Sequence, residues 1–159
     1  MQQKPETMEL SLLLPVIEEV LSRGGEFELH PRGESMLPAI REGRDTVMLS
    51  RAVPPYARGD LLLYRRKNGV LVLHRVVKVE RDGTLTMRGD NQLTCERGIP
   101  SEQVIATVKR YFRNGHEVRT DSMRARFYRF RRTVGYPFRR IAHAIGWRLK
   151  RIFQGERNG

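Results

Sequence analysis

A serine in a loop of glycine and proline is the first residue of the chain that could do chemistry. The segment reads Arg32-Gly33-Glu34-Ser35-Met36-Leu37-Pro38 and follows no helix or strand periodicity. Glycine permits tight backbone geometry and proline fixes the following turn, so Ser35 can be exposed beside backbone N–H groups. Acyl transfer requires a nucleophile next to such donors. For this segment alone, a turn serine without chemistry stays an open interpretation.

Two further segments could supply a base and an acid. By two-residue alternation, His74 lies on the same face of an apolar run as Val70, Val72 and Val76. An imidazole held there can act as a general base, although it can equally be a satisfied core residue. Asp90 stands in Arg88-Gly89-Asp90-Asn91. This segment is either a simple turn or the source of a carboxylate that orients an imidazole.

Short strands are the elements that would position these residues. We expect strands over residues 46–49, 60–65, 70–79 and 104–112, with hairpins where Lys67-Asn68-Gly69 and Asp82-Gly83 interrupt apolar runs. Asn-Gly favours such a hairpin because both turn positions take positive φ angles. Several short strands separated by turns indicate a compact, mainly β domain.

One helix is expected before the strands, over residues 10–22. Its predicted inward side comprises Leu13, Val16, Ile17, Val20 and Leu21. Pro15 fits if it lies in the first turn, and Gly24-Gly25 would end the helix.

Four short segments, taken in order, resemble the signal peptidase I family. They are residues 33–38, 59–64, 74–77 and 88–91. The resemblance is to the histidine-type branch of the endoplasmic reticulum and archaea, also found in some spore-forming bacteria. The usual bacterial enzymes, and the SOS-repressor autoproteases of the same fold, have lysine in place of that histidine. The resemblance covers about residues 30–112 and implies a signal-peptidase-like serine protease domain.

This resemblance implies a role for each candidate residue. Ser35 matches the nucleophile, His74 the general base and Asp90 the essential acid, and the Ser35 N–H would be an oxyanion donor. The implied reaction is endoproteolysis of a peptide or preprotein through an acyl-enzyme, with small side chains before the cut and no metal or other cofactor. The family often has a further acid shortly after Gly-Asp-Asn, and here only Glu96 could serve. Glu34 beside the nucleophile would oppose an oxyanion unless it points away or is paired.

Charge divides the chain into a nearly neutral body and a cationic end. The 159 residues carry a net charge of +12, and residues 119–159 hold 12 Lys or Arg against two acids. Large apolar residues follow helical spacing there: Phe127, Phe130, Val134, Phe138, Ile141, Ile145, Leu149 and Ile152. We therefore expect an N-terminal helical segment (1–25), the protease domain (26–118) and a basic amphipathic helical tail (119–159).

Three roles stay open for this tail. It can pack on the domain through its apolar stripe, or residues 121–153 can lie on an anionic membrane surface. It can also bind nucleic acid, as in a non-proteolytic regulator that keeps the fold. The most apolar run, 10–21, is too short and charged to span a bilayer, and no secretory signal pattern is visible, so a cytoplasmic or peripheral membrane location is expected. The single cysteine, Cys95, excludes an internal disulfide and a Cys-based metal cage.

Overall fold

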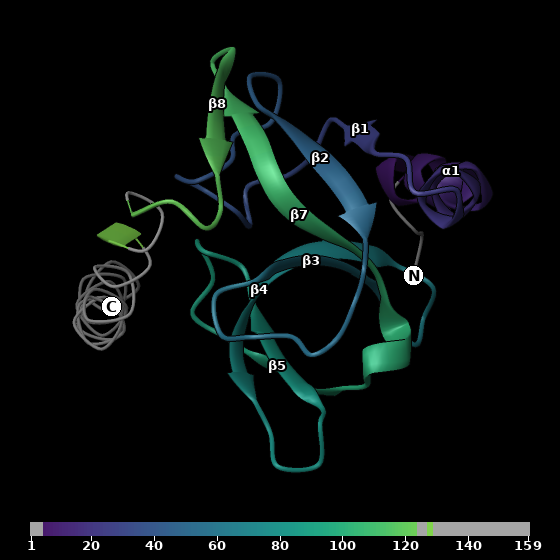
Figure 1. The fold of residues 1–159 in the computed structure, drawn as a ribbon, viewed down its shortest axis with the longest axis vertical. Helices are drawn as coiled ribbons and strands as arrows, with labels where there is room; N and C mark the ends of the chain where they lie inside the picture. The colour runs from purple at the N-terminus through teal and green to yellow at the C-terminus, as the bar shows by residue number, and fades with distance from the viewer. Residues whose placement is uncertain (1–4, 124–126, 129–159) are drawn as a thin grey trace, which may run out of the picture.

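A computed structural model describes residues 5–123 and 127–128, with only the backbone described for 5–11. Helix α1 (Pro5–Ser22) comes first, and the strands follow it (Figure 1). They are β1 (Phe27–Leu29), β2 (Thr46–Arg51), β3 (Leu61–Arg65), β4 (Leu71–Val79), β5 (Leu85–Arg88), β6 (Glu96–Ile99), β7 (Val104–Arg113) and β8 (His116–Arg119). A short 3-10 helix, η1 (Ser101–Gln103), precedes β7.

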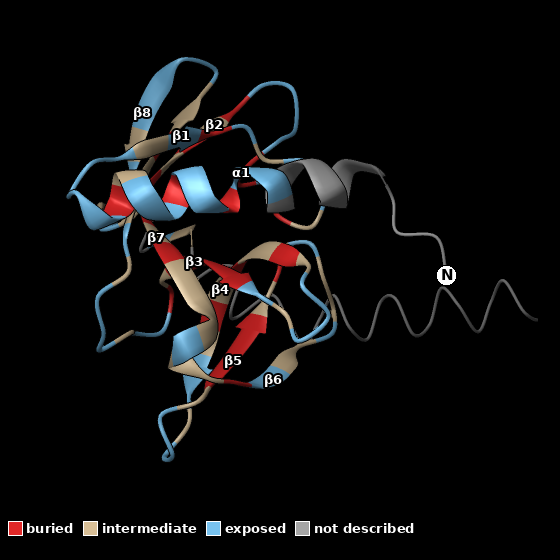
Figure 2. Ribbon diagram, turned by 90° about the vertical axis from the view of Figure 1, so that its right-hand side faces the viewer, coloured by how far each residue is buried: buried red, intermediate tan, exposed pale blue. Residues whose placement is uncertain are grey.

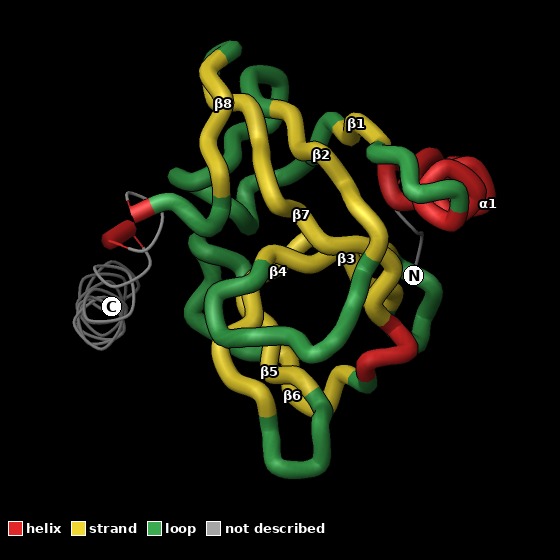
Figure 3. Tube along the Cα trace, viewed as in Figure 1, coloured by secondary structure: helices red, strands yellow, loops and turns green. Residues whose placement is uncertain are grey.

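These strands form one antiparallel sheet in the order β1-β2-β7-β3-β4-β5-β6, with β8 pairing β7. The long strand β7 therefore lies between β2 and β3 and joins the early strands to the later hairpins, as the tube in Figure 3 also shows. The mainly β class expected from the sequence is confirmed. The strands predicted over 46–49, 60–65, 70–79 and 104–112 correspond to β2, β3, β4 and β7.

Strand β3 is buried on both faces and serves two cores. Leu61 and Leu63 pack in a first core with α1, β2 and β7, whereas Leu62 and Tyr64 pack in a second core with β4, β5 and β6. Successive side chains of a strand point to opposite faces, so a continuous apolar run can fill two cores at once. The buried segments of α1, β3 and β5 stand out in Figure 2.

Helix α1 differs from the prediction in length and in its inward face. It begins at Pro5, so Pro15 lies inside the helix and not in its first turn. Leu13 and Val16, expected inside, are 42% and 48% exposed. The buried side chains with the required spacing are Leu14, Ile17 and Leu21. The predicted face was wrong because leucines at 10 and 12–14 surround the helix, so periodicity alone does not select one side.

Both expected hairpins form, but their turns have a different type. At residues 67–69 the Arg66 N–H donates to Val70 O at 2.9 Å, and only Gly69 has a positive φ, +84°. The result is a three-residue loop closed by a left-handed glycine, and residues 81–83 repeat it. Positive φ at both turn positions occurs instead at Asn114 (51°) and Gly115 (78°), which connect β7 to the unpredicted strand β8.

Most of the expected tail helix lies outside the described residues. Strand β8 ends at Arg119, and Tyr128 packs against the first core. Met123 and Phe127 are 76% and 63% exposed. None of the described helices is long and apolar enough to cross a membrane.

Candidate active site

The loop between β1 and β2 holds Ser35 outside any helix or strand, as its sequence indicates. Met36 and Ile40 are buried in the first core, and the Ile40 N–H donates to Met36 O at 3.0 Å. On the other side of the serine, the Gly33 N–H donates to Glu42 Oε2 at 2.8 Å. Ser35 is therefore carried by a loop that is anchored on both sides.

His74 comes from β4 and is 1% exposed. It lies on the same face as the buried Val76, as strand alternation predicts. Its Nδ1 atom is 3.3 Å from the Tyr64 hydroxyl and 3.3 Å from Glu96 Oε1. Nε2, the opposite ring nitrogen, is turned toward the segment that carries Gly89.

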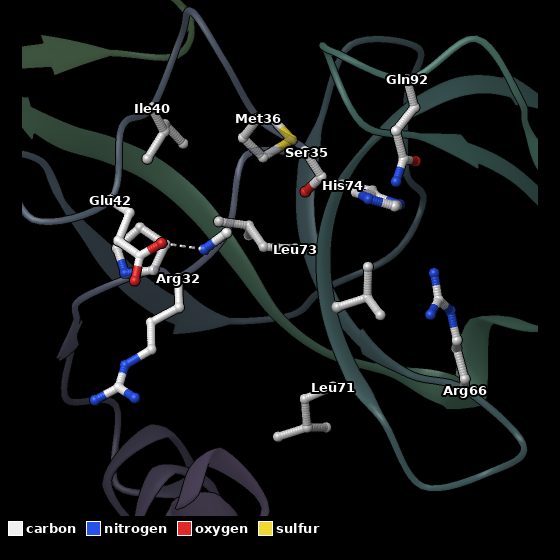
Figure 4. A pocket seen from close by; sticks show the side chains of 13 residues that line it. Arg32, Ser35, Met36, Ile40, Glu42, Arg66, Leu71, Leu73, His74 and Gln92 are labelled. Atoms are coloured by element: carbon white, nitrogen blue, oxygen red, sulfur yellow. Dashed lines mark hydrogen bonds between the residues drawn. The ribbon is translucent and has the colours of Figure 1, made fainter. Parts of the chain in front are cut away.

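Gly89 is the point at which the nucleophile and the histidine meet. A Cβ atom placed on this glycine would lie 3.1 Å from His74 Nε2, 3.1 Å from Ser35 Cβ and 2.6 Å from Ser35 O. His74 Nε2 and Ser35 Cβ are therefore no more than twice 3.1 Å apart. The Asn91 N–H also donates to Ser35 O at 2.8 Å. The structure thus brings together the predicted nucleophile and base (Figure 4).

Two features of Ser35 bear on what it can do. Among the described residues no hydrogen bond joins its hydroxyl to His74, whose ring nitrogen Nδ1 contacts Tyr64 and Glu96. Catalytic hydrogen bonds are often long in free active sites and shorten when substrate binds. Rotation about the Cα–Cβ bond moves the hydroxyl without moving the anchored loop. Within the same described part of the chain, the Ser35 N–H donates to no backbone acceptor, so it can receive an oxyanion.

Glu96 is the carboxylate at Nδ1 of the histidine. It begins the edge strand β6, and it accepts from Arg66 Nε at 2.7 Å and from Arg66 Nη2 at 2.5 Å. Burial alone would raise the pKa of Glu96, but the hydrogen bonds from Arg66 and Tyr64 bring the pKa below its ordinary value. Glu96 is therefore a charged acceptor next to His74. The sequence alone indicates Glu96 only as the one residue that could be the further acid after Gly-Asp-Asn.

Asp90 makes different contacts. Its two carboxylate oxygens accept from Arg75 Nε and Nη2 at 2.9 and 2.8 Å, and the Tyr128 hydroxyl donates to it at 3.4 Å. Arg75 also donates to Gly59 O at 3.0 Å. The Arg75 and Asp90 side chains are 14% and 7% exposed. This ion pair joins the Gly89 segment to β4, while the contact at His74 Nδ1 comes from Glu96.

An open cavity of about 250 Å³ adjoins Ser35 and His74. Five aliphatic side chains line it: Met36, Ile40, Leu71, Val72 and Leu73. Arg66 and Gln92 line it on the histidine side in Figure 4. Arg32 and Glu42 line the opposite side, so Ser35 opens onto a cavity of mixed apolar and polar lining. Elsewhere, Glu34 beside the nucleophile is exposed to solvent.

Burial sets the protonation of the histidine. It lowers the pKa of His74 to about 4, and the charge of Arg66 lowers it too, while the charges of Glu96 and Asp90 oppose the shift. Because Arg66 already compensates Glu96, the carboxylate does not hold a proton on the ring at neutral pH. His74 is consequently a neutral imidazole, the form that accepts a proton.

Among the described residues, no three His, Cys, Asp or Glu side chains gather as metal ligands would. No family model and no curated protein matches the chain. A function for this protein is therefore proposed from the geometry of the site and from the sequence features described above.

We expect His74 to titrate below its ordinary pKa of about 6.5. The measurement is an NMR titration of the His74 ring Cε1–H, with the urea-unfolded protein as reference. Since the folded pKa lies below the unfolded one, the unfolded chain binds the extra proton first. Stability should therefore fall as the pH drops from about 6.5 toward the folded pKa. A midpoint above 6.5 in the folded protein would contradict this account of burial.

Substitution Gly89→Ala should separate Ser35 from His74. The new Cβ would lie 2.6 Å from the Ser35 carbonyl oxygen, so one of the two backbones must shift. We expect faster amide exchange at Asn91, whose N–H donates to that oxygen. Thr94→Ala, an exposed change in the same loop, is the matched control. Equal exchange rates in Gly89→Ala and wild type would show that this contact is unimportant.

Proposed function

We propose that this protein is a serine endopeptidase that resembles signal peptidase I of the histidine type. One observation carries the proposal: Ser35 and His74 Nε2 meet at Gly89, while Nδ1 of the same ring faces the carboxylate of Glu96. A nucleophile, a base and an orienting acid in this relation are the parts of a serine protease triad. The ordered segments that resemble the family contribute the same serine and histidine.

The reaction follows from these positions. His74 Nε2 accepts the Ser35 Oγ proton as Oγ bonds to the peptide carbonyl carbon, and the Ser35 N–H donates to the resulting oxyanion. The imidazolium then gives its proton to the leaving amine, the C–N bond breaks, and an acyl ester remains on Ser35. A water molecule then gives a proton to His74 as it bonds to the ester carbon; the C–O bond to Ser35 breaks, His74 returns the proton to Ser35 Oγ, and the carboxyl product leaves.

Glu96 and Asp90 take separate roles in this proposal. Glu96 accepts from Nδ1–H and stabilises the imidazolium that forms when the base takes a proton. Asp90, which the family resemblance assigns as the essential acid, acts on the loop through Arg75. That ion pair keeps Gly89 and Asn91 against Ser35, so its loss would disturb the nucleophile through the backbone.

The substrate class is a signal or leader peptide presented in an extended form. Small side chains before the cut are what the family resemblance implies. The aliphatic lining of the cavity beside Ser35 is compatible with apolar residues near the scissile bond.

The positive charge of residues 119–159 suggests that the protein binds its substrate at a membrane surface. Residues 119–159 carry ten of the twelve net positive charges, and Met123 and Phe127, at the start of this segment, are exposed. Each basic residue near an anionic membrane contributes about 1 kcal/mol to binding. We propose that residues 121–153 hold the enzyme on an anionic membrane surface.

Ser35→Ala and His74→Ala should each abolish cleavage and leave the fold intact. Wild type and variants are incubated with a pool of synthetic peptides with small residues before the intended cut, and products are identified by mass spectrometry. Ser101→Ala, outside the site, should cleave like wild type. The proposal fails if the folded wild type leaves every peptide intact, or if Ser35→Ala cleaves as well as wild type.

Glu96→Gln and Asp90→Asn should lower activity for different reasons. Glu96→Gln removes the charge at Nδ1, so kcat should fall by about 100-fold or more with little change in KM. Asp90→Asn leaves Arg75, whose side chain is 14% exposed, without its anionic partner, and breaking a fully buried pair costs about 3–5 kcal/mol of stability, so a smaller loss is expected here. Urea unfolding of both variants separates the two effects. A stable Asp90→Asn with normal folding and no activity would instead make Asp90 the direct catalytic acid.

Full-length protein should sediment with anionic vesicles at low salt, and a variant ending at residue 118 should stay in solution. Added salt should release the full-length protein because the Debye screening length shortens to about 8 Å at physiological ionic strength. Neutral vesicles are the control. Retention in the supernatant with anionic vesicles, together with salt-sensitive RNA or DNA binding, would favour the nucleic-acid role over the membrane role.

A further inference from the structure

Tyr64 is a buried polar residue to which the proposed reaction assigns no role. Its side chain on β3 is 0% exposed, and its ring centroid lies 6.1 Å from that of His74. The hydroxyl and Glu96 Oε1 each lie 3.3 Å from His74 Nδ1, and hydrogen bonding to Glu96 is one cause of the raised pKa of the phenol. A buried phenol normally finds a hydrogen-bond partner, and this one reaches both residues that support the base. It does not line the cavity beside Ser35.

Two proton arrangements fit these positions, and they have opposite consequences. If the phenol donates to Nδ1, the neutral histidine carries its proton on Nε2, the nitrogen that faces Ser35. Nε2 then cannot accept the serine proton. If the phenol donates to Glu96, Nδ1 carries the proton and Nε2 presents its lone pair to Ser35.

The charge of Glu96 selects the second arrangement. Arg66 binds this carboxylate at 2.7 and 2.5 Å, so it stays ionised and acts only as an acceptor. Glu96 Oε1 is 3.3 Å from Nδ1, and an unprotonated Nδ1 would set a lone pair against a negative oxygen. A carboxylate offers about four lone-pair sites, so it can accept from Arg66, Tyr64 and His74 together.

We propose, on the basis of the peptidase function given above, that Tyr64 is the positioning residue for the general base. Its hydroxyl donates to Glu96 and holds the carboxylate where that group accepts from Nδ1–H. The phenol oxygen lies beside the same proton and can accept from it as well. Together these contacts keep Nε2 unprotonated toward Ser35. Tyr64 therefore acts on the reaction through His74 and contacts neither the nucleophile nor the substrate cavity.

Tyr64→Phe tests this role because it removes the hydroxyl and keeps the ring that packs in the second core. The ratio of His74 tautomers is read from the two ring-nitrogen chemical shifts by 15N NMR, and kcat and KM are measured with a cleavable peptide. We expect wild type to carry the proton on Nδ1, and the variant to gain Nε2–H tautomer. Loss of such a supporting contact should lower kcat by about 10- to 100-fold at unchanged KM. Tyr56→Phe, which removes a hydroxyl beside the same core, should match wild type in all three measurements.

Several outcomes would overturn the role of Tyr64. One is wild-type protein with His74 protonated mainly on Nε2 at neutral pH, which decides the matter even if Tyr64→Phe does not fold. Another is a folded Tyr64→Phe with wild-type tautomer ratio and kcat. Failure of the peptidase proposal would give a different result: Ser35→Ala would cleave normally, or no peptide would be cut. The tautomer ratio still reports on Tyr64 in that case.

Discussion

Close packing at Gly89 is the constraint on which the rest of the site depends. The backbones of the Gly89 and Ser35 segments meet the His74 side chain there, and the space between them does not admit a Cβ. The Asn91 N–H donates to Ser35 O, so the contact also fixes how the nucleophile loop approaches β4. On the other side, the Arg75–Asp90 ion pair ties the same segment to the strand that carries His74. Without the contacts at Gly89, Ser35 on its loop and His74 on β4 would not be held close to each other.

A balance of charge and burial then determines what the histidine can do. Burial favours the neutral ring, and Glu96 would favour the charged one if it stood alone. Arg66 compensates Glu96, so the carboxylate orients Nδ1–H without holding the ring protonated at rest. In the proposed reaction the ring takes a proton, and the same carboxylate is in place to stabilise it. His74 would thus be neutral before attack and stabilised by Glu96 after it.

Local chemistry made part of this arrangement predictable. Glycine and proline around Ser35 indicate a loop, and alternation places His74 on a buried strand face; both are correct. The β7–β8 hairpin was not predicted because the residues after its Asn-Gly turn, His116 to Arg119, are mainly polar and do not read as a strand. Strand β6 reads Glu96-Arg97-Gly98-Ile99, a poor strand pattern, so nothing local shows that Glu96 reaches His74 across the sheet. That relation depends on long-range register, which spacing along the chain does not contain.

The two cores that share β3 give the site a mechanical property. Ser35 is fastened to the first core through Met36 and Ile40, whereas His74 and Tyr64 lie with the second core around Val76. The site therefore lies at the boundary between the two cores, and a small rotation of one core against the other would separate Ser35 from His74 while each core kept its own packing. Partial openings of this kind cost less free energy than complete unfolding. In mild denaturant, the peptidase activity proposed above would be lost while the sheet persists, and a molecule bound to both Ser35 and His74 would stabilise the boundary between the two cores.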